Sequence, residues 1–126
     1  MRKYKNLENK ELLKTIRIYR ETKYEKLEKK MLEMIAEADY LSPIILSPDV
    51  EEGYTRFVSI MNENNEHYLP LFTDWDSLKN WSKTHKEVVL TSLLEIADMS
   101  IQDENIRGIC INPFNENIVF KKGVRN

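Results

Sequence analysis

The sequence is poor in the residues that many functional motifs require. Among its 126 residues are three glycines, four prolines, two histidines and one cysteine. Glycine and proline together make up about 12% of an average protein, so their scarcity excludes collagen-like and low-complexity character and favours long regular elements. Gly53, Gly108 and Gly123 lie too far apart to form a phosphate-binding loop or a dinucleotide-binding turn. This absence excludes most nucleotide-dependent chemistry of familiar design.

Cysteine and histidine are too scarce to form a structural zinc site, which takes about four such ligands. Cys110 has no partner for an intramolecular disulfide, which favours a reducing, cytoplasmic setting. It lies in an apolar stretch, where we expect a small buried side chain. His67 and His85 have no second ligand at the right spacing, and His85 is expected to interact with the end of a helix. We therefore expect no metal ion and no cofactor.

Long apolar stretches are absent as well. No segment approaches the roughly 20 apolar residues of a membrane-spanning helix, and no signal-peptide core follows the first residues. The length suits one compact domain, and 41% of the residues are apolar, which is enough for one core. We expect a single soluble domain over residues 1–126, with a basic helical segment at 1–40, a body at 41–126 and no membrane partner.

The net charge of −2 conceals an uneven distribution. Residues 1–30 carry 11 basic and 5 acidic side chains, whereas residues 31–126 carry 8 basic and 16 acidic ones. Basic residues interleaved with tyrosines, as in residues 2–30, are typical of some nucleic-acid binders. The acidic residues among them and an isoelectric point of about 5.8 disfavour that interpretation. We expect the basic segment to contact the acidic remainder, in the same chain or in a neighbouring copy.

The N-terminal segment predicts two helices. Asn6 or Asn9 is the expected cap of the first helix, and Thr22 with Glu25 matches a capping box that starts the second. Apolar side chains recur at intervals of three and four residues, the helical period, in two groups. They are Leu7, Leu12, Leu13 and Ile16, then Tyr24, Leu27, Met31, Met34, Ile35 and Ala38.

The body predicts strands in its first half. Residues 41–46 form an apolar run with an early proline, which is typical of an edge or entry strand. Residues 56–61 and 68–73 are expected to pair as a hairpin around the asparagine-rich turn at 62–67, because asparagine tolerates the backbone conformations of tight turns.

The second half of the body alternates helices and strands. Thr73 with Asp76 and Ser92 with Glu95 have the spacing of helix starts. Residues 87–90, 106–111 and 117–120 are expected strands. The order is ααβββαβαββ, an α+β (mixed α/β) domain in which N-terminal helices precede a mixed sheet with helices packed on it.

Four segments in a fixed order resemble a known family. Residues 68–81 read YLPLFTDWDSLKNW, and residues 108–114 read GICINPF. The P-L-F-T run before a tryptophan helix, followed later by I-N-P-F, is similar to two blocks of the SseB (enhanced serine sensitivity) protein N-terminal domain family. Residues 117–122 resemble its closing strand, and residues 40–44 resemble an earlier strand. The resemblance covers roughly residues 7–122.

The resemblance implies a bacterial-type, mixed α/β module without agreed catalytic residues. Arg107 stands where the family often has aspartate, so no role for that carboxylate carries over. Asn112 before Pro113 is expected to be extended and to bond nearby backbone. Trp75 and Phe114 suit either the core or an interface, with the core as the default.

Three functions stay open. The favoured one is a non-enzymatic protein-interaction or regulatory module, with another protein or a second copy as its partner. A small-molecule sensor or small enzyme with a site near Thr73 and Asn112 is the alternative, and nucleic-acid binding through residues 2–30 is the second alternative. The candidate interaction surface comprises Thr73, Asp74, Trp75, Asn112, Pro113 and Phe114.

Overall fold

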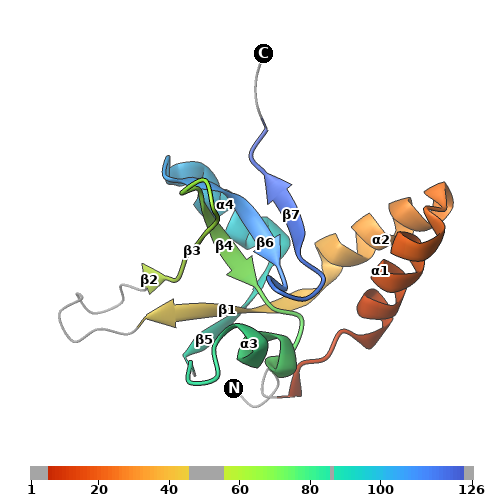
Figure 1. Ribbon diagram of the computed structural model, residues 1–126, viewed down its shortest axis with the longest axis horizontal. Coiled ribbons are helices and arrows are strands. Elements are labelled where there is room, and N and C mark those ends of the chain that lie inside the picture. Colours follow the sequence, from red (N-terminus) through yellow and green to blue (C-terminus); the bar gives the residue numbers. More distant parts are fainter. Residues whose placement is uncertain (1–5, 46–55, 86, 124–126) are drawn as a thin grey trace.

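A computed structural model describes residues 6–45, 56–85 and 87–123. Within these ranges the chain forms an α+β fold, as predicted, with one more short strand than expected (Figure 1). The elements are α1 Lys10–Thr22, α2 Glu25–Glu37, β1 Asp39–Ile45, β2 Arg56–Phe57, β3 Ile60–Met61, β4 His67–Leu71, α3 Trp75–Trp81, β5 Val88–Ser92, α4 Leu93–Gln102, β6 Ile106–Ile111 and β7 Ile118–Lys121. Among these residues, no helix has both the length and the apolar character needed to cross a membrane.

The strands form two small sheets. The larger sheet has the order β3-β4-β6-β7, with β4 and β6 parallel and the other pairs antiparallel. The smaller sheet has the order β2-β1-β5 and is antiparallel. An isolated bridge between Leu41 and Phe72 joins the two sheets. The parallel pair places the ends of β4 and β6 side by side, and this is where the candidate site lies.

The main core lies between the larger sheet, α4 and the helical hairpin formed by α1 and α2. The hairpin contributes buried apolar side chains that pack against residues of β4, β6 and α4. Tyr40 is fully buried beneath it and donates a hydrogen bond to the carbonyl oxygen of Ile35 at 2.6 Å. Burial raises the pKa of this phenol above its ordinary value. The hairpin side chains concerned are Leu12, Ile16, Met31 and Ile35.

A second apolar cluster lies under α3. Leu41, Phe72, Leu78 and Val88 are buried there, and Trp81 packs against them with its ring centroid 5.5 Å from that of Phe72. Trp81 is thus partly buried and packs inward. Both clusters border the junction between the two sheets.

The first predicted strand was assigned to the wrong place in its sheet. β1 is the central strand between β2 and β5, not an edge strand. Pro43 is tolerated because it pairs with Val88 at the last position of the β1–β5 register, where few ladder bonds remain to be lost. Its carbonyl oxygen still accepts a hydrogen bond from the Val58 amide at 3.1 Å.

The predicted hairpin is confirmed only in its inner part. β3 pairs antiparallel with β4, and Asn65 in the turn has the positive φ that asparagine tolerates. The expected strand over 56–61 is interrupted, however, because β2 pairs with β1 in the other sheet.

Two of the three predicted capping boxes are wrong. Thr22 is the last residue of α1, and Lys23 in the left-handed conformation separates the helices, so the N-cap of α2 is Tyr24. The N-cap of α3 is Asp74, whose carboxylate accepts from the Ser77 amide at 2.8 Å, and not Thr73.

The capping box of α4 is confirmed. The Glu95 amide donates to Ser92 Oγ, and Ser92 Oγ donates to the Glu95 carboxylate, both at 3.2 Å. This box satisfies a free amide of the first turn and fixes where the helix begins.

The hairpin packs on the body through apolar contacts. Within the described ranges, the ion pairs are Lys10–Glu8 and Arg107–Glu66, and neither joins the hairpin to the body. The expected electrostatic attraction between a basic segment and an acidic body therefore has no ion pair in this part of the chain. The first five residues, which supply three of the basic side chains, lie outside the described ranges.

Gly108 is required by the close approach of β6 to β7. A Cβ atom there would lie 2.0 Å from the carbonyl oxygen of Phe120, so Gly108→Ala must force the two strands apart. We expect the free energy of unfolding to fall by about 2 kcal/mol, the cost of overpacking. In the control Gly123→Ala, nothing lies within 4 Å, and the change should stay within about 0.5 kcal/mol. Urea unfolding followed by circular dichroism measures both, and equal effects would contradict the prediction.

Candidate functional site

A buried pair of polar residues joins the ends of the parallel strands. Thr73 follows β4 and Asn112 follows β6, and both are fully buried. The Thr73 amide donates to Asn112 Oδ1 at 3.0 Å, and Asn112 Nδ2 donates to Thr73 Oγ1 at 2.8 Å. The backbone amide of Asn112 extends the hydrogen-bond ladder between β4 and β6 by donating to the Leu71 carbonyl oxygen at 2.8 Å. The Thr73 hydroxyl in turn donates to the Asp74 carboxylate at 2.9 Å. The polar groups of the two residues are thus satisfied by each other and by their neighbours, which is the condition for burying them.

The same pair anchors the turn between β6 and β7. Asn112 has φ 51°, so the expected extended conformation before Pro113 is wrong. Its side chain does bond backbone, as predicted, but the bonded amide belongs to Thr73. Asn112 Nδ2 also donates to the Glu116 carboxylate at 2.8 Å, and the Asn112 carbonyl oxygen accepts from the amides of Asn115 and Asn117 at 3.0 and 2.9 Å. The turn is therefore held at several points.

Asn9 attaches the start of α1 to this junction. It occupies the expected N-cap position, but its side chain makes no cap hydrogen bond. Asn9 Nδ2 donates instead to the carbonyl oxygens of Thr73 at 2.8 Å and Asp39 at 3.0 Å. The side-chain amide of Asn9 thus connects the start of α1 to the first residue of β1 and to the loop before α3.

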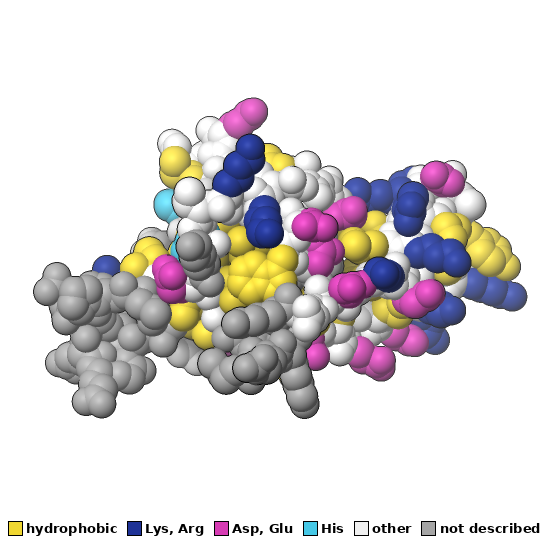
Figure 2. All heavy atoms as spheres, turned by 90° about the horizontal axis from the view of Figure 1, so that it is seen from below, with side chains coloured by type: hydrophobic (Ala, Val, Ile, Leu, Met, Phe, Trp, Pro, Cys, Tyr) yellow, Lys and Arg dark blue, Asp and Glu magenta, His cyan; other side chains and the backbone are white. Residues whose placement is uncertain are grey.

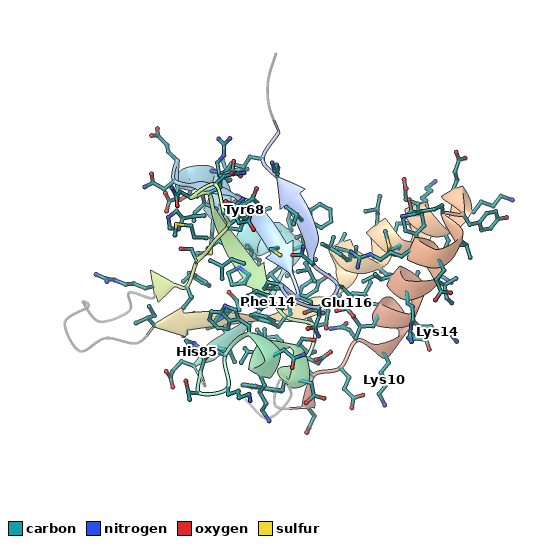
Figure 3. All side chains as sticks on the ribbon, viewed as in Figure 1. Lys10, Lys14, Tyr68, His85, Phe114 and Glu116 are labelled. Atoms are coloured by element: carbon teal, nitrogen blue, oxygen red, sulfur yellow. The ribbon has the colours of Figure 1, made fainter. Side chains whose placement is uncertain are left out.

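Phe114 projects from the anchored turn into solvent. Its side chain is 78% exposed, and its backbone has φ 75°. A left-handed conformation costs a residue with a side chain about 1–2 kcal/mol, so the surrounding hydrogen bonds must impose it. Figure 3 shows Phe114 and Glu116 together at this turn, between the larger sheet and the helix that carries Lys10 and Lys14. A strained, exposed aromatic residue on an anchored turn is the most distinctive surface feature in the described ranges.

Two shallow hollows lie along α1 and the residues before it, and the second one borders the turn. The first has a volume of about 380 Å³ and is lined by Asn6, Leu7, Glu8, Asn9, Lys10, Leu13, Asp74, Trp75 and Asp76. The second, of about 450 Å³, is lined by Leu13, Ile16, Arg17, Arg20, Glu21, Asn115 and Glu116. They meet at Leu13. Figure 2 shows Lys and Arg side chains over the hairpin end of the molecule, and carboxylates between that end and the body.

The six residues of the candidate interaction surface therefore lie at two depths. Thr73, Asn112 and Pro113 are buried and support the junction. Asp74 and Trp75 are half-buried beside the first hollow, and Phe114 is exposed.

The sequence indicates Asn9 only as a helix cap, because nothing local indicates its bonds to distant carbonyl oxygens. It gives no sign of the role of Glu116, which acts within a turn of unexpected conformation.

The cysteine and the two histidines lie outside the junction and contact neighbouring groups of the protein. Cys110 is buried, as predicted, and its thiol donates to Asn117 Oδ1 at 3.1 Å. Burial raises the pKa of this thiol to about 11. His67 contacts Ser59 Oγ at 3.2 Å, while His85 contacts the Glu87 carbonyl oxygen and the Trp81 ring and does not lie on a helix end. Across the described ranges, no three His, Cys, Asp or Glu side chains group as metal ligands.

The hairpin has only a weak basic character where it is described. Residues 10–37 carry eight basic and six acidic side chains, and three of the eleven basic side chains of residues 1–30 belong to residues 2–5, outside the described ranges. This near balance is far from the basic footprint of a nucleic-acid binder.

The comparisons with known proteins agree with the two sequence blocks that meet at the junction. The model of the SseB protein N-terminal domain family matches residues 12–122. No curated protein and no solved structure matches the chain.

Asn112→Ala tests the junction. It removes the bonds to Thr73 and leaves a buried amide unsatisfied, so we expect the free energy of unfolding to fall by about 3 kcal/mol. Asn65→Ala is the matched control, because Asn65 has a similar φ of 62° but is exposed, and it should cost about 1 kcal/mol. Thermal and urea unfolding measure both. If the two variants lost the same stability, the buried hydrogen bonds would contribute nothing.

Cys110 provides a second test through its reactivity. With a pKa of about 11, only about 0.1% of the thiol is ionised at pH 8, compared with about a quarter of an ordinary thiol. We expect the native protein to react with a disulfide reagent at least about a hundredfold more slowly than the protein unfolded in denaturant, since thiolate is the reactive form. A native rate near that of the unfolded chain would show that the thiol is accessible and ionised.

Proposed function

We propose that this chain, which belongs to the SseB protein N-terminal domain family, is a non-enzymatic protein-interaction module whose contact surface is centred on Phe114. The observation that carries the proposal is the exposure of this side chain at 78% in a left-handed backbone conformation. A free surface residue gains nothing from such strain, whereas a contact residue gains a fixed position.

The physics of interfaces supports this assignment. Aromatic residues supply much of the binding energy at protein interfaces, and a preorganised one loses little conformational freedom when it binds. Phe114 lies in a turn that Asn112 stabilises through its hydrogen bond to Glu116. A hollow lined in part by Asn115 and Glu116 lies beside this turn. A partner can therefore surround the ring and fill the adjoining hollow.

The small-molecule alternative receives less support from the geometry. It places a site at Thr73 and Asn112, but these side chains are buried and bond to each other and to Glu116. A ligand would have to break these hydrogen bonds before it could use the groups. The contact surface is better placed on the exposed side of the turn.

The proposed setting is the cytoplasm. The free and buried thiol of Cys110 supports a reducing compartment. The partner is therefore sought among proteins of the same compartment.

The substitution Phe114→Gly distinguishes an effect on partner binding from an effect on the stability of the fold. Glycine adopts a positive φ without strain, so we expect the free energy of unfolding to stay the same or rise by up to about 1 kcal/mol. In cells of the source organism, a photo-crosslinking residue at Asn115 should capture a discrete partner beside Phe114 and lose it in the Phe114→Gly background. Mass spectrometry of the adducts identifies the captured protein.

The control is the same crosslinker at Tyr24, which is 57% exposed between the two hairpin helices. It should not capture the partner. Capture at both positions, or undiminished capture after Phe114→Gly, would overturn the proposed surface.

A further inference from the structure

The outer strand of the larger sheet has an open edge. β7 is the last strand in the order β3-β4-β6-β7, and in the described part of the chain no strand pairs with its other side. Figure 1 shows this strand on the side of the sheet that faces the helical hairpin. The backbone amides and carbonyls on such an edge can pair with an added strand.

A hollow lies at the start of this edge. Leu13 and the buried Ile16 are apolar residues of its lining, which also contains Asn115 and Glu116, three and two residues before the first residue of β7. An extended segment paired with β7 can continue into this hollow and pass Phe114, so the edge and the proposed contact surface are continuous.

The charged residues around β7 indicate which kind of extended segment pairs with this strand. Arg17 and Arg20 line the hollow, and neither makes an ion pair within the described ranges. Lys121 is exposed at the other end of the strand, and Val119 between them is 44% exposed. Glu21 and Glu116 also line the hollow, but Glu116 is held by Asn112.

We propose that β7 accepts an extended acidic segment of another protein as an added strand. Carboxylates of that segment would lie at Arg17 and Arg20 at one end and at Lys121 at the other, and an apolar side chain would cover Val119. This inference rests on the proposed interaction function and names the chemistry of the partner: main-chain pairing for affinity, and acidic flanks for specificity.

A second copy of the chain is a poorer occupant of the same edge. Antiparallel pairing of two β7 strands would bring Lys121 of each copy toward the Arg17 and Arg20 end of the other. Like charges at such a pairing are destabilising, and a lysine on an edge strand is a common protection against self-pairing. The charges therefore favour a foreign acidic strand.

The test uses the purified full chain and defined peptides. The probe is a short blocked peptide in which valine and threonine alternate between pairs of glutamates. Its matched controls carry lysines in place of the glutamates, or N-methyl groups on the central backbone amides. Amide chemical shifts of the labelled protein report the position of binding, and titration gives the affinity.

We expect the glutamate peptide to shift the amides of residues 118–121 and to lose at least tenfold in affinity when its backbone is N-methylated. Arg17→Ala with Arg20→Ala should weaken binding about fivefold, the effect of losing two exposed charge pairs. The matched control, Lys26→Ala with Lys29→Ala on α2, removes the same charge away from the hollow and should leave affinity within twofold.

Three results would overturn the inference: no shift in β7 at millimolar peptide, equal binding of the lysine peptide, or a concentration-dependent dimer that shifts the same amides. Failure of the peptide with retained crosslinking at Asn115 would reject the added strand alone. Loss of crosslinking as well would reject the interaction surface itself.

Discussion

The fold depends on one side-chain amide that is buried where two parallel strands end. Parallel neighbours finish at the same edge of a sheet, and each leaves unpaired backbone groups there. Asn112 pairs the free backbone groups of both strands. Its backbone amide donates to the Leu71 carbonyl oxygen, and its side-chain oxygen accepts from the Thr73 backbone amide. The Thr73 carbonyl oxygen is in turn bonded by Asn9. Strand ends, first helix and β6–β7 turn thus share one connected set of hydrogen bonds, in which each group left unpaired would carry a desolvation cost.

This set explains how an unfavourable conformation is maintained on the surface. The left-handed backbone at Phe114 is imposed by the bonds that Asn112 makes to Asn115, Glu116 and Asn117. The buried hydrogen bonds and the exposed ring are therefore parts of one arrangement. Asn112 fixes the turn from the interior, and Phe114, two residues later, presents the proposed contact at the surface. The candidate residues divide between interior and surface for this reason.

The sequence predicts what local physics decides. The box of Ser92 and Glu95 sets the start of α4 through bonds that span three residues, and the hairpin turn around Asn65 depends on one backbone preference. The two motif blocks, and with them the family, were also recognisable. The central position of β1 and the left-handed conformation of Asn112 were not, because both depend on partners about 40 residues or more away in sequence. The spacing of Thr73 predicts a cap, yet its hydroxyl accepts from Asn112 and donates to the Asp74 carboxylate, and it is Asp74 that caps the helix.

Charge plays a different part from the one that composition indicates. Apolar side chains such as Ile16 and Ile35 attach the hairpin to the body, so its cations are not needed to hold it there. Cations that form no ion pair within the protein remain available to select a partner. In the described ranges, Arg17 and Arg20 form no ion pair, and both are exposed in the lining of a hollow beside an open strand edge. The apolar attachment of the hairpin is thus what leaves these cations free to act in recognition.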